Sequence, residues 1–324
     1  MDEKKLEKID VSVVMTTWGH DKFIVQAIEG VLNQKFDGNI ELIVTNDRSP
    51  DETDKIVTNY LRNTVIPENI YVKYILNEKN LGAVKNFLFT IGISRGEFIG
   101  VCEGDDYWID PYKVQKQVDF LRENTDCNLA FHRVQVLNEN GELTPEELNN
   151  SETSFKRDIH YLAEFGNFMH TPSVMFRNNL EFDERIFTDR IGDYVVWFIS
   201  GQKGKFGYIP DVMSVYRLWN GSIWGLKSEY FRIQNSLRML IRMIKYNEDD
   251  QINKLLVKQA KKLFLFVSLK EMNLKERLNY LKLTYEVSPS FTWKLLLKGF
   301  SHVKKGRMFI NLIFMDQIIK WVSF

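Results

Sequence analysis

The sequence is poor in the residues that build cross-linked or extended proteins. It holds 2 cysteines and 7 prolines in 324 residues. Two cysteines, Cys102 and Cys127, cannot form a disulfide framework, which excludes a small disulfide-stabilised secreted protein. Little proline and 44% hydrophobic residues exclude collagen-like, low-complexity and disordered chains. The length provides enough apolar material for one large domain or two smaller ones.

Long apolar runs are also missing. No stretch stays apolar over the roughly 18 to 20 residues that a membrane-spanning helix needs. The longest candidates, around 263–267 and 309–315, are interrupted by Lys and Asp on either side. The first ten residues, MDEKKLEKID, contain no apolar core of a signal peptide. We therefore expect a cytoplasmic protein, either free or peripheral on the inner face of the cell membrane.

Several common catalytic motifs do not occur. There is no GxGxxG or GxxxxGK[ST] run, which excludes Rossmann dehydrogenases and P-loop proteins. The lack of a glycine-rich loop near the N-terminus also argues against a nucleotidyltransferase. The five histidines lack zinc-site spacing, and no GxSxG turn supplies the nucleophile of an α/β-hydrolase.

Residues 11 to 102 do contain a regular alternation of strand-like and helical patterns. Strands are predicted at 11–17, 40–45, 71–76 and 97–102, with helices at 21–34, 53–62 and 83–94. This order predicts an α/β fold with a mostly parallel sheet flanked by helices. Because ligands bind beyond the carboxyl ends of such strands, the residues that follow each strand are the first candidates for a site.

The pattern changes after residue 110. A helix is predicted at 110–123 with Pro111 in its first turn, and residues 138–154 predict a mobile surface loop. Further strands are predicted at 129–137, 171–176, 206–209 and 213–217, with a helix at 193–201. From about residue 226 the chain is rich in Lys and Leu with helical periodicity, which predicts three to five helices.

The zero formal charge of the chain hides an uneven distribution. Residues 226–324 contain 19 Lys and Arg against 8 Asp and Glu, whereas residues 1–225 contain 24 against 35. A basic segment of this kind favours an anionic partner. The alternative is an interface between an acidic body and a basic tail, and the charges do not choose between the two.

Two adjacent carboxylates, Asp105 and Asp106, follow the predicted strand at 97–102. Neighbouring carboxylates repel each other unless a cation lies between them, and hard oxygen ligands suit Mg²⁺ or Mn²⁺. The alternative is a solvated cap of the helix at 110–123.

Three other side chains have both a functional and a structural interpretation. Asp47 follows the second strand and is available for the ring N–H of a base or as a helix cap. Trp18 follows the first strand and could stack on a base or pack on the sheet edge. Asp193 begins a helix and suits a general base in a cleft as well as a plain N-cap.

Four segments of the first half, taken together, resemble glycosyltransferase family 2. Residues 11–18 resemble its first strand, 32–51 the run ending in Asp-Asp-x-Ser-x-Asp, 80–99 an Asn-x-Gly to Gly-Glu-Tyr-Ile stretch, and 103–111 the DxD region. Residues 192–194, 215–217 and 221–224 resemble the acceptor half of bacterial polysaccharide transferases. The similarity spans about residues 10 to 225.

The resemblance implies a Rossmann-like GT-A fold and a division of the chain. Residues 1–225 would form the catalytic domain, with a nucleotide-binding half at about 10–105 and an acceptor half at 106–225. Residues 226–324 would form a basic helical C-terminal region. Its Lys304, Lys305 and Arg307 precede an apolar run, which suits an anionic membrane surface; the alternative is a packing or dimerising helical cap.

The resemblance also implies roles for individual residues. Thr16, Trp18 and Asp47 would hold the base of the donor nucleotide, and Lys85 would lie near its phosphates. Asp105 would contact the ribose or the metal, and Asp106 would ligate Mn²⁺ or Mg²⁺. Asp193 would be the general base. Arg217 and Trp224 would line the acceptor or donor-sugar side, and Trp108 and Trp197 are either sugar platforms or core residues.

These roles imply an inverting, metal-dependent glycosyltransferase. A sugar, most simply from a UDP-sugar, would pass to a saccharide or lipid-linked saccharide in cell-surface polysaccharide synthesis, with no nucleic-acid partner. The rival hypothesis is a non-catalytic sugar-nucleotide-binding or scaffold protein that kept the fold. The sequence departs from the family pattern at Glu103 and Asn46, where Asp is usual, and at Trp219, where His is common.

Overall fold

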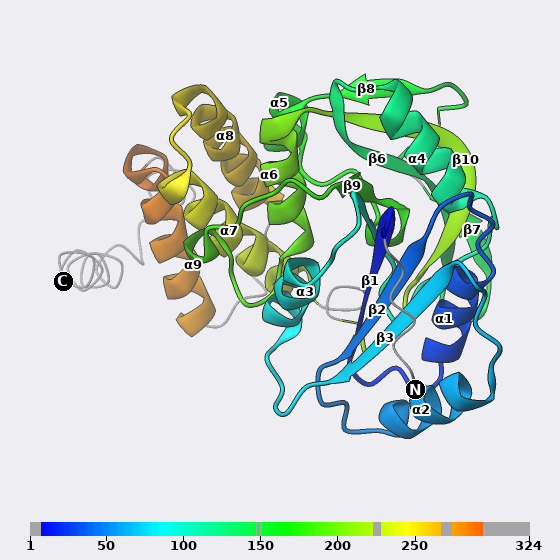
Figure 1. Ribbon diagram of the computed structural model, residues 1–324. Coiled ribbons are helices and arrows are strands. Elements are labelled where there is room, and N and C mark those ends of the chain that lie inside the picture. The colour runs from blue at the N-terminus through cyan, green and yellow to red at the C-terminus, as the bar shows by residue number, and fades with distance from the viewer. Residues whose placement is uncertain (1–7, 147, 150, 223–227, 267–273, 294–324) are drawn as a thin grey trace. The chain divides into compact units, whose positions relative to one another are not determined.

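The computed structural model describes residues 8–146, 148–149, 151–222, 228–266 and 274–293. The chain divides into two compact units, residues 1–227 and 228–324 (Figure 1). The predicted basic and apolar run at 304–315 lies outside the described residues, as does Trp224.

The first half of the first unit is the parallel sheet that the alternation predicts. Its elements are β1 (Val11–Thr17), α1 (Ile24–Leu32), β2 (Ile40–Asn46), α2 (Thr53–Asn63), β3 (Ile70–Leu76), α3 (Ala83–Gly92) and β4 (Phe98–Val101). The strands lie in the order β3-β2-β1-β4, and each neighbouring pair is parallel. Helices α1 and α2 cover one face and α3 covers the other (Figure 1). This arrangement brings the carboxyl ends of β1, β2 and β4 to one edge.

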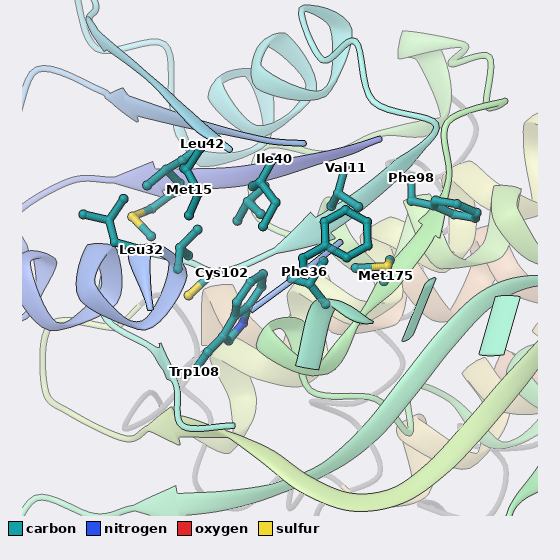
Figure 2. Close-up of a cluster of buried hydrophobic side chains, with 14 of the residues drawn as sticks. Val11, Met15, Leu32, Phe36, Ile40, Leu42, Phe98, Cys102, Trp108 and Met175 are labelled. Atoms are coloured by element: carbon teal, nitrogen blue, oxygen red, sulfur yellow. The ribbon is translucent and has the colours of Figure 1, made fainter. Parts of the chain in front are cut away.

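Burial explains the composition of these strands. Every residue of β2 is buried, because helices cover both faces of the sheet, which accounts for its apolar run Leu42–Val44. The edge strand β3 is only partly buried. Figure 2 shows the core on the α1 side, where Met15 and Leu42 of the sheet meet Leu32 of α1 and the indole of Trp108. Each of these side chains contributes about 1.5–3 kcal/mol through burial.

The second half extends the same sheet with mixed strand directions. Its elements are β5 (Tyr107–Trp108), α4 (Lys113–Glu123), β6 (Cys127–Leu137), β7 (Leu143–Pro145), β8 (Phe155–Arg157), α5 (Ile159–Phe165), β9 (Met175–Arg177), α6 (Asp193–Lys203) and β10 (Lys205–Arg217). Strand β9 is antiparallel to both β4 and β6, while β6 and β10 are parallel. The sheet is therefore parallel from β3 to β4 and mixed beyond β4.

Several predicted boundaries in this half were wrong. Helix α4 begins at Lys113, after Pro111 rather than around it, because Asp110 Oδ1 accepts the Tyr112 N–H in a turn at 2.8 Å. The predicted strand at 171–176 is a 3₁₀ turn, Thr171–Ser173, followed by β9. The two short strands expected at 206–209 and 213–217 are one strand, β10, with register shifts between Ile209 and Ser214. The predicted loop at 138–154 contains the short strand β7.

The described part of the second unit contains α7 (Glu229–Tyr246), α8 (Asp250–Phe266) and α9 (Leu274–Val287). Ser228 caps α7, since its side chain accepts the Phe231 N–H at 3.2 Å. Leu237, Leu240 and Met243 on one face of α7 are buried, as the helical periodicity predicts. Among the described helices, none is both long enough and apolar enough to cross a membrane.

Candidate active site

Three loops that follow parallel strands meet at one edge of the sheet. The loop after β2 is joined to β1 by the Asp47 N–H, which donates to Thr17 O at 2.9 Å. The loop after β4 is joined to β1 by the Gly104 N–H, which donates to Thr16 O at 2.9 Å. The loop after β1 is held by Gly19 N–H donating to Ser49 Oγ at 3.1 Å. The strand-end rule therefore placed Thr16, Asp47 and the Asp105–Asp106 pair correctly at one edge.

The turn after β4 gathers three carboxylates. One oxygen from each of Glu103, Asp105 and Asp106 lies within 4.8 Å of the others. A Cβ on Gly104 would lie 2.8 Å from both Thr17 Oγ1 and His20 Nδ1. Glycine is thus required for this turn to fold tightly against the loop after β1.

Asp106 is the most deeply buried of the three, with 2% of its surface exposed. Its Oδ1 accepts the Arg217 N–H at 2.8 Å, but its Oδ2 has no partner among the described residues. Burial, followed by Asp105 and Glu103, raises the pKa of Asp106 well above its usual value. An unpaired buried carboxylate oxygen costs several kcal/mol unless a cation or proton satisfies it.

Glu103 strengthens the case for a cation. Burial, and then the charges of Asp105 and Asp193, raise the pKa of Glu103 to about 8. Thr17 Oγ1 and His20 Nδ1 beside the same turn are also buried without a partner in the described part of the chain. Three mutually repelling carboxylates, with an unpaired oxygen on Asp106, are the donor set that Mg²⁺ or Mn²⁺ prefers, so the residues present fit such an ion.

Asp105 is oriented by two aromatic side chains. Its Oδ2 accepts the Trp219 Nε1–H at 2.8 Å, and His20 Nε2 lies 3.8 Å from the same oxygen. The Trp219 ring stands edge-on to Phe23, with centroids 5.1 Å apart. Trp219 was noted in the sequence only as a departure from the family pattern; its N–H holds Asp105 in place.

Arg217 lies against the same turn. Its Nε donates to Asp105 O at 2.8 Å and its Nη2 to Gln26 Oε1 at 2.9 Å. Its guanidinium covers the Phe23 ring at 4.4 Å from the centroid. These contacts occupy Arg217 in holding the carboxylate turn, and the acceptor or donor-sugar contact expected for it stays a prediction.

Asp193 is the first residue of α6, and its charge contributes to the raised pKa of Glu103, after burial and Asp105. Thr171 Oγ1 donates to its Oδ2 at 3.4 Å. Burial raises the pKa of Asp193 above its usual value. The residue thus combines the position of an acidic first-turn residue with the raised pKa expected of a general base.

Asp47 organises the loop that precedes α3. Its Oδ1 accepts the Leu81 N–H at 2.7 Å and Asn77 Nδ2 at 2.9 Å, and its Oδ2 accepts the Gly82 N–H at 2.9 Å. The alternative that Asp47 caps α2 is not observed; Asp51 Oδ1 accepts the Thr53 N–H there at 3.1 Å. Asp47 Oδ2 still has one lone pair for a ligand.

The other predicted residues differ in exposure. Trp18 is 50% exposed, so its ring is free to stack on a base. Thr16 is partly buried, and Lys85 is exposed on α3. Trp108 and Trp197 are buried, and Trp108 Nε1 donates to Pro172 O at 3.1 Å. Burial favours the packing interpretation of these two rings over a sugar platform.

Sequence reasoning missed the side chains that link the two halves of the site. Thr171 contacts Asp193, Trp219 contacts Asp105, and burial together with the charges of the four carboxylates raises the pKa of Tyr216. The Tyr-Arg pair at 216–217 was noted as part of the resemblance, without a role for the tyrosine. The position of Tyr216 follows only from the pairing of β10 with β6 in the folded chain.

Comparisons with known proteins identify the family of the chain. The family model described as glycosyl transferase family 2 matches residues 12–182. An uncharacterized protein of Mycobacterium bovis is 30% identical over 215 residues. The match covers 66% of this chain and 60% of that relative's own length.

Solved structures share the fold at low sequence identity. TarS residues 1–349 from S. aureus, solved with UDP-GlcNAc, has a TM-score of 0.64 at 16% identity, covering 88% of this chain and 83% of that one. The mannosyltransferase PcManGT from Pyrobaculum calidifontis, solved with GDP-Man and Mn²⁺, has a TM-score of 0.55 at 12% identity, covering 98% and 84%. Since the family model covers more than half of the chain, including the strands and the carboxylate turn after β4, the chain belongs to glycosyltransferase family 2 and has a GT-A fold.

Proposed function

We propose that the protein is an inverting, metal-dependent glycosyltransferase that uses a nucleotide-sugar donor, a UDP-sugar by preference. The observation that carries this proposal is the cluster of Glu103, Asp105 and Asp106, with Asp193 near enough for its charge to raise the pKa of Glu103. The cluster has an unpaired buried oxygen on Asp106, and burial raises the pKa of Asp193. A cation site opposite a base is the arrangement that an inverting transfer needs.

Asp106 and Asp105, with Glu103 beside them, would hold Mn²⁺ or Mg²⁺. The ion would neutralise the negative charge that grows on the departing diphosphate. Trp219 and Arg217 keep the carboxylate turn in a fixed geometry before the donor arrives. A PcManGT complex with Mn²⁺ in the same fold supports the choice of a divalent ion.

Asp193 would take the proton from the acceptor hydroxyl. It would act from the face of the sugar opposite the diphosphate, so that the anomeric centre inverts, as in inverting glycosidases. Its raised pKa favours this role, because a stronger base accepts the proton more readily. Thr171 Oγ1, 3.4 Å away, orients the carboxylate.

The nucleotide would lie across the ends of β1 and β2. Trp18 would stack on the base, Thr16 and Asp47 would bind its polar edge, and Lys85 would approach the phosphates. The TarS complex with UDP-GlcNAc supports a uridine donor. The acceptor would be a saccharide or a lipid-linked saccharide of a cell-surface polysaccharide.

The C-terminal region of residues 226–324 would bring the enzyme to such an acceptor. Its excess of Lys and Arg suits an anionic membrane surface on the cytoplasmic side, and a packing or dimerising role remains the competing proposal. Sedimentation of the full chain with vesicles containing anionic lipid tests the first idea. A chain that stays in the supernatant at low salt, and runs as a dimer, would favour the second.

A ligand panel tests the donor and the ion together. Thermal shift with UDP-GlcNAc, UDP-glucose, UDP-galactose, GDP-mannose and dTDP-glucose is measured with Mn²⁺ and with EDTA. We expect Mn²⁺-dependent stabilisation by at least one UDP-sugar and slow hydrolysis of that donor. Stabilisation by GDP-mannose or dTDP-glucose alone would replace uridine as the donor base.

A matched pair of variants tests the proposed cation site. Asp106→Asn should remove the Mn²⁺-dependent stabilisation and lower the hydrolysis by about 10²–10³-fold. Asp119→Asn, at an exposed carboxylate of α4, should change neither. If the protein binds a sugar nucleotide but neither hydrolyses nor transfers it with any saccharide acceptor, the non-catalytic alternative is correct.

A further inference from the structure

Tyr216 lies between the two halves of the proposed site. The next residue in β10, Arg217, donates its N–H to Asp106 Oδ1 at 2.8 Å, which ties this end of the strand to the carboxylate turn. On the other side, the Tyr216 ring lies 4.8 Å from the His170 ring. His170 precedes Thr171, whose hydroxyl contacts Asp193. Tyr216 thus stands between the cation-binding carboxylates and the general base.

The hydroxyl of Tyr216 is a free, neutral donor. It makes no hydrogen bond with any residue that the structure describes, whereas the hydroxyls of Tyr74, Tyr194 and Tyr208 all have partners. Burial and the charges of the four carboxylates, largest first Asp106, Glu103, Asp105 and Asp193, raise the pKa of Tyr216 well above its usual value. Tyr216 is partly buried, and its hydroxyl oxygen is not among the fully buried atoms without a partner, so it is accessible and available to a ligand atom.

The position of Tyr216 indicates which part of the donor its hydroxyl would reach. In the proposed reaction the cation holds the diphosphate, and Asp193 approaches from the opposite face of the sugar. The group that lies between these two is the transferred sugar itself. We propose that the Tyr216 hydroxyl hydrogen-bonds the transferred sugar of the donor, and that His170 and Glu146 position its ring.

The positioning side chains form a short chain of contacts. Glu146 is almost fully buried; its Oε1 accepts the Val134 N–H at 2.9 Å, and its Oε2 lies 3.5 Å from His170 Nε2. The His170 ring also packs against the Tyr216 ring, with an interplanar angle of 39°. Ser173 Oγ donates to His170 O at 2.6 Å and fixes the backbone there. The Tyr216 ring is therefore held from behind by a side chain that is itself anchored to β6.

This inference rests on the proposed function and is tested by comparing two ligands. The sugar nucleotide of the panel that binds wild type most tightly, and the nucleoside diphosphate of the same base, are titrated with Mn²⁺ by calorimetry. Tyr216→Phe keeps the ring and removes the hydroxyl. We expect the affinity for the sugar nucleotide to fall roughly two- to tenfold, the effect of one lost hydrogen bond, while that for the diphosphate stays unchanged.

Tyr208→Phe is the matched control, because Tyr208 lies on the same strand and its hydroxyl donates to Ser151 O instead. It should change neither affinity. Equal losses for both ligands in Tyr216→Phe, or no loss for either, would overturn the sugar contact. If wild type binds no sugar nucleotide of the panel although it is folded, the proposed function itself is wrong.

Double variants test whether His170 and Glu146 act through Tyr216. Glu146→Gln and His170→Phe should weaken the affinity for the sugar nucleotide by no more than Tyr216→Phe does and leave that for the nucleoside diphosphate unchanged, as expected when the group that contacts the sugar is loosened. In combination with Tyr216→Phe, either change should have a smaller effect than it has alone. Fully additive effects would show that His170 and Glu146 serve only the stability of the fold.

Discussion

Two buried carboxylates in the same sheet have opposite surroundings. Glu41, near the amino end of β2, accepts Ser12 Oγ and the Arg95 N–H on one oxygen, at 2.5 and 2.6 Å, and Arg95 Nε and Nη2 on the other, at 2.9 and 2.8 Å. Asp106, beyond the carboxyl end of β4, has an oxygen without any partner in the described chain. Both are at most 2% exposed.

The difference indicates which of the two charges stabilises the fold. A buried carboxylate with all its hydrogen bonds made ties together the elements that donate to it, here β1, β2 and the turn before β4. A buried carboxylate with a free oxygen destabilises the folded protein, and a bound cation would offset that cost. Removal of each charge should therefore have opposite consequences for stability and activity.

The largest expected effect is on chemistry at Asp193. Asp193→Asn keeps the shape and the contact with Thr171 but removes the base. We expect kcat for donor turnover to fall by about 10²–10⁴-fold, the usual contribution of a general base. Calorimetry should show an unchanged affinity for the sugar nucleotide. A variant with wild-type kcat would exclude Asp193 as the base.

Asp106→Asn should lose activity by about 10²–10³-fold, because the ion that offsets the diphosphate charge is no longer held. The free energy of unfolding in EDTA should stay the same or rise, since a buried charge without a partner is removed. Urea denaturation in EDTA and in Mn²⁺ measures this. A strongly destabilised Asn variant would mean that Asp106 is a structural residue like Glu41.

Glu41→Gln should lower the stability of the fold and leave the activity unchanged. Several hydrogen bonds to a buried charge are weakened at once, so the free energy of unfolding should fall by about 2–4 kcal/mol. The activity per folded molecule should remain that of wild type, because the contacts of Glu41 lie near the amino ends of the strands. A loss of kcat at a temperature where the variant is fully folded would contradict this separation.

Lys113 extends the comparison to a buried cation. It is fully buried against Trp108, with Nζ 3.9 Å from the ring centroid and 2.5 Å from Gln117 Oε1. Burial lowers the pKa of Lys113 to about 7. Between this value and the ordinary lysine pKa, about 10.4, the unfolded chain binds more protons, so stability should rise with pH from about 7 to 10.

Lys113→Met tests that origin of the pH dependence. The variant should lose the rise in stability between pH 7 and 10, and it should be more stable than wild type at pH 6 by about 1–3 kcal/mol. Urea denaturation at four or five pH values measures both. An identical pH profile in the variant would assign the dependence to other groups.

Local sequence patterns predict the residues at the strand ends but not the contacts made by β10. Parallel strand order alone places Asp47, Asp105 and Asp106 at one edge, because strand ends and helix periodicity are local properties of the chain. Contacts such as Trp219 with Asp105 or His170 with Tyr216 join residues 114 and 46 positions apart. They depend on the irregular pairing of β10 with β6, which no local pattern indicates.

The smallest expected effect is the change in Mn²⁺ affinity on replacing Trp219. Trp219→Phe keeps a ring near Phe23 but removes the N–H that Asp105 Oδ2 accepts. Asp105 then keeps His20 as its neighbour, so we expect the affinity for Mn²⁺ in the presence of nucleoside diphosphate to weaken only about two- to tenfold. Trp219→His, which can restore a ring N–H or ligate the ion directly, should recover the affinity. If Trp219→Phe binds Mn²⁺ more tightly than wild type, the indole competes with the ion for Asp105 instead of orienting that carboxylate for it.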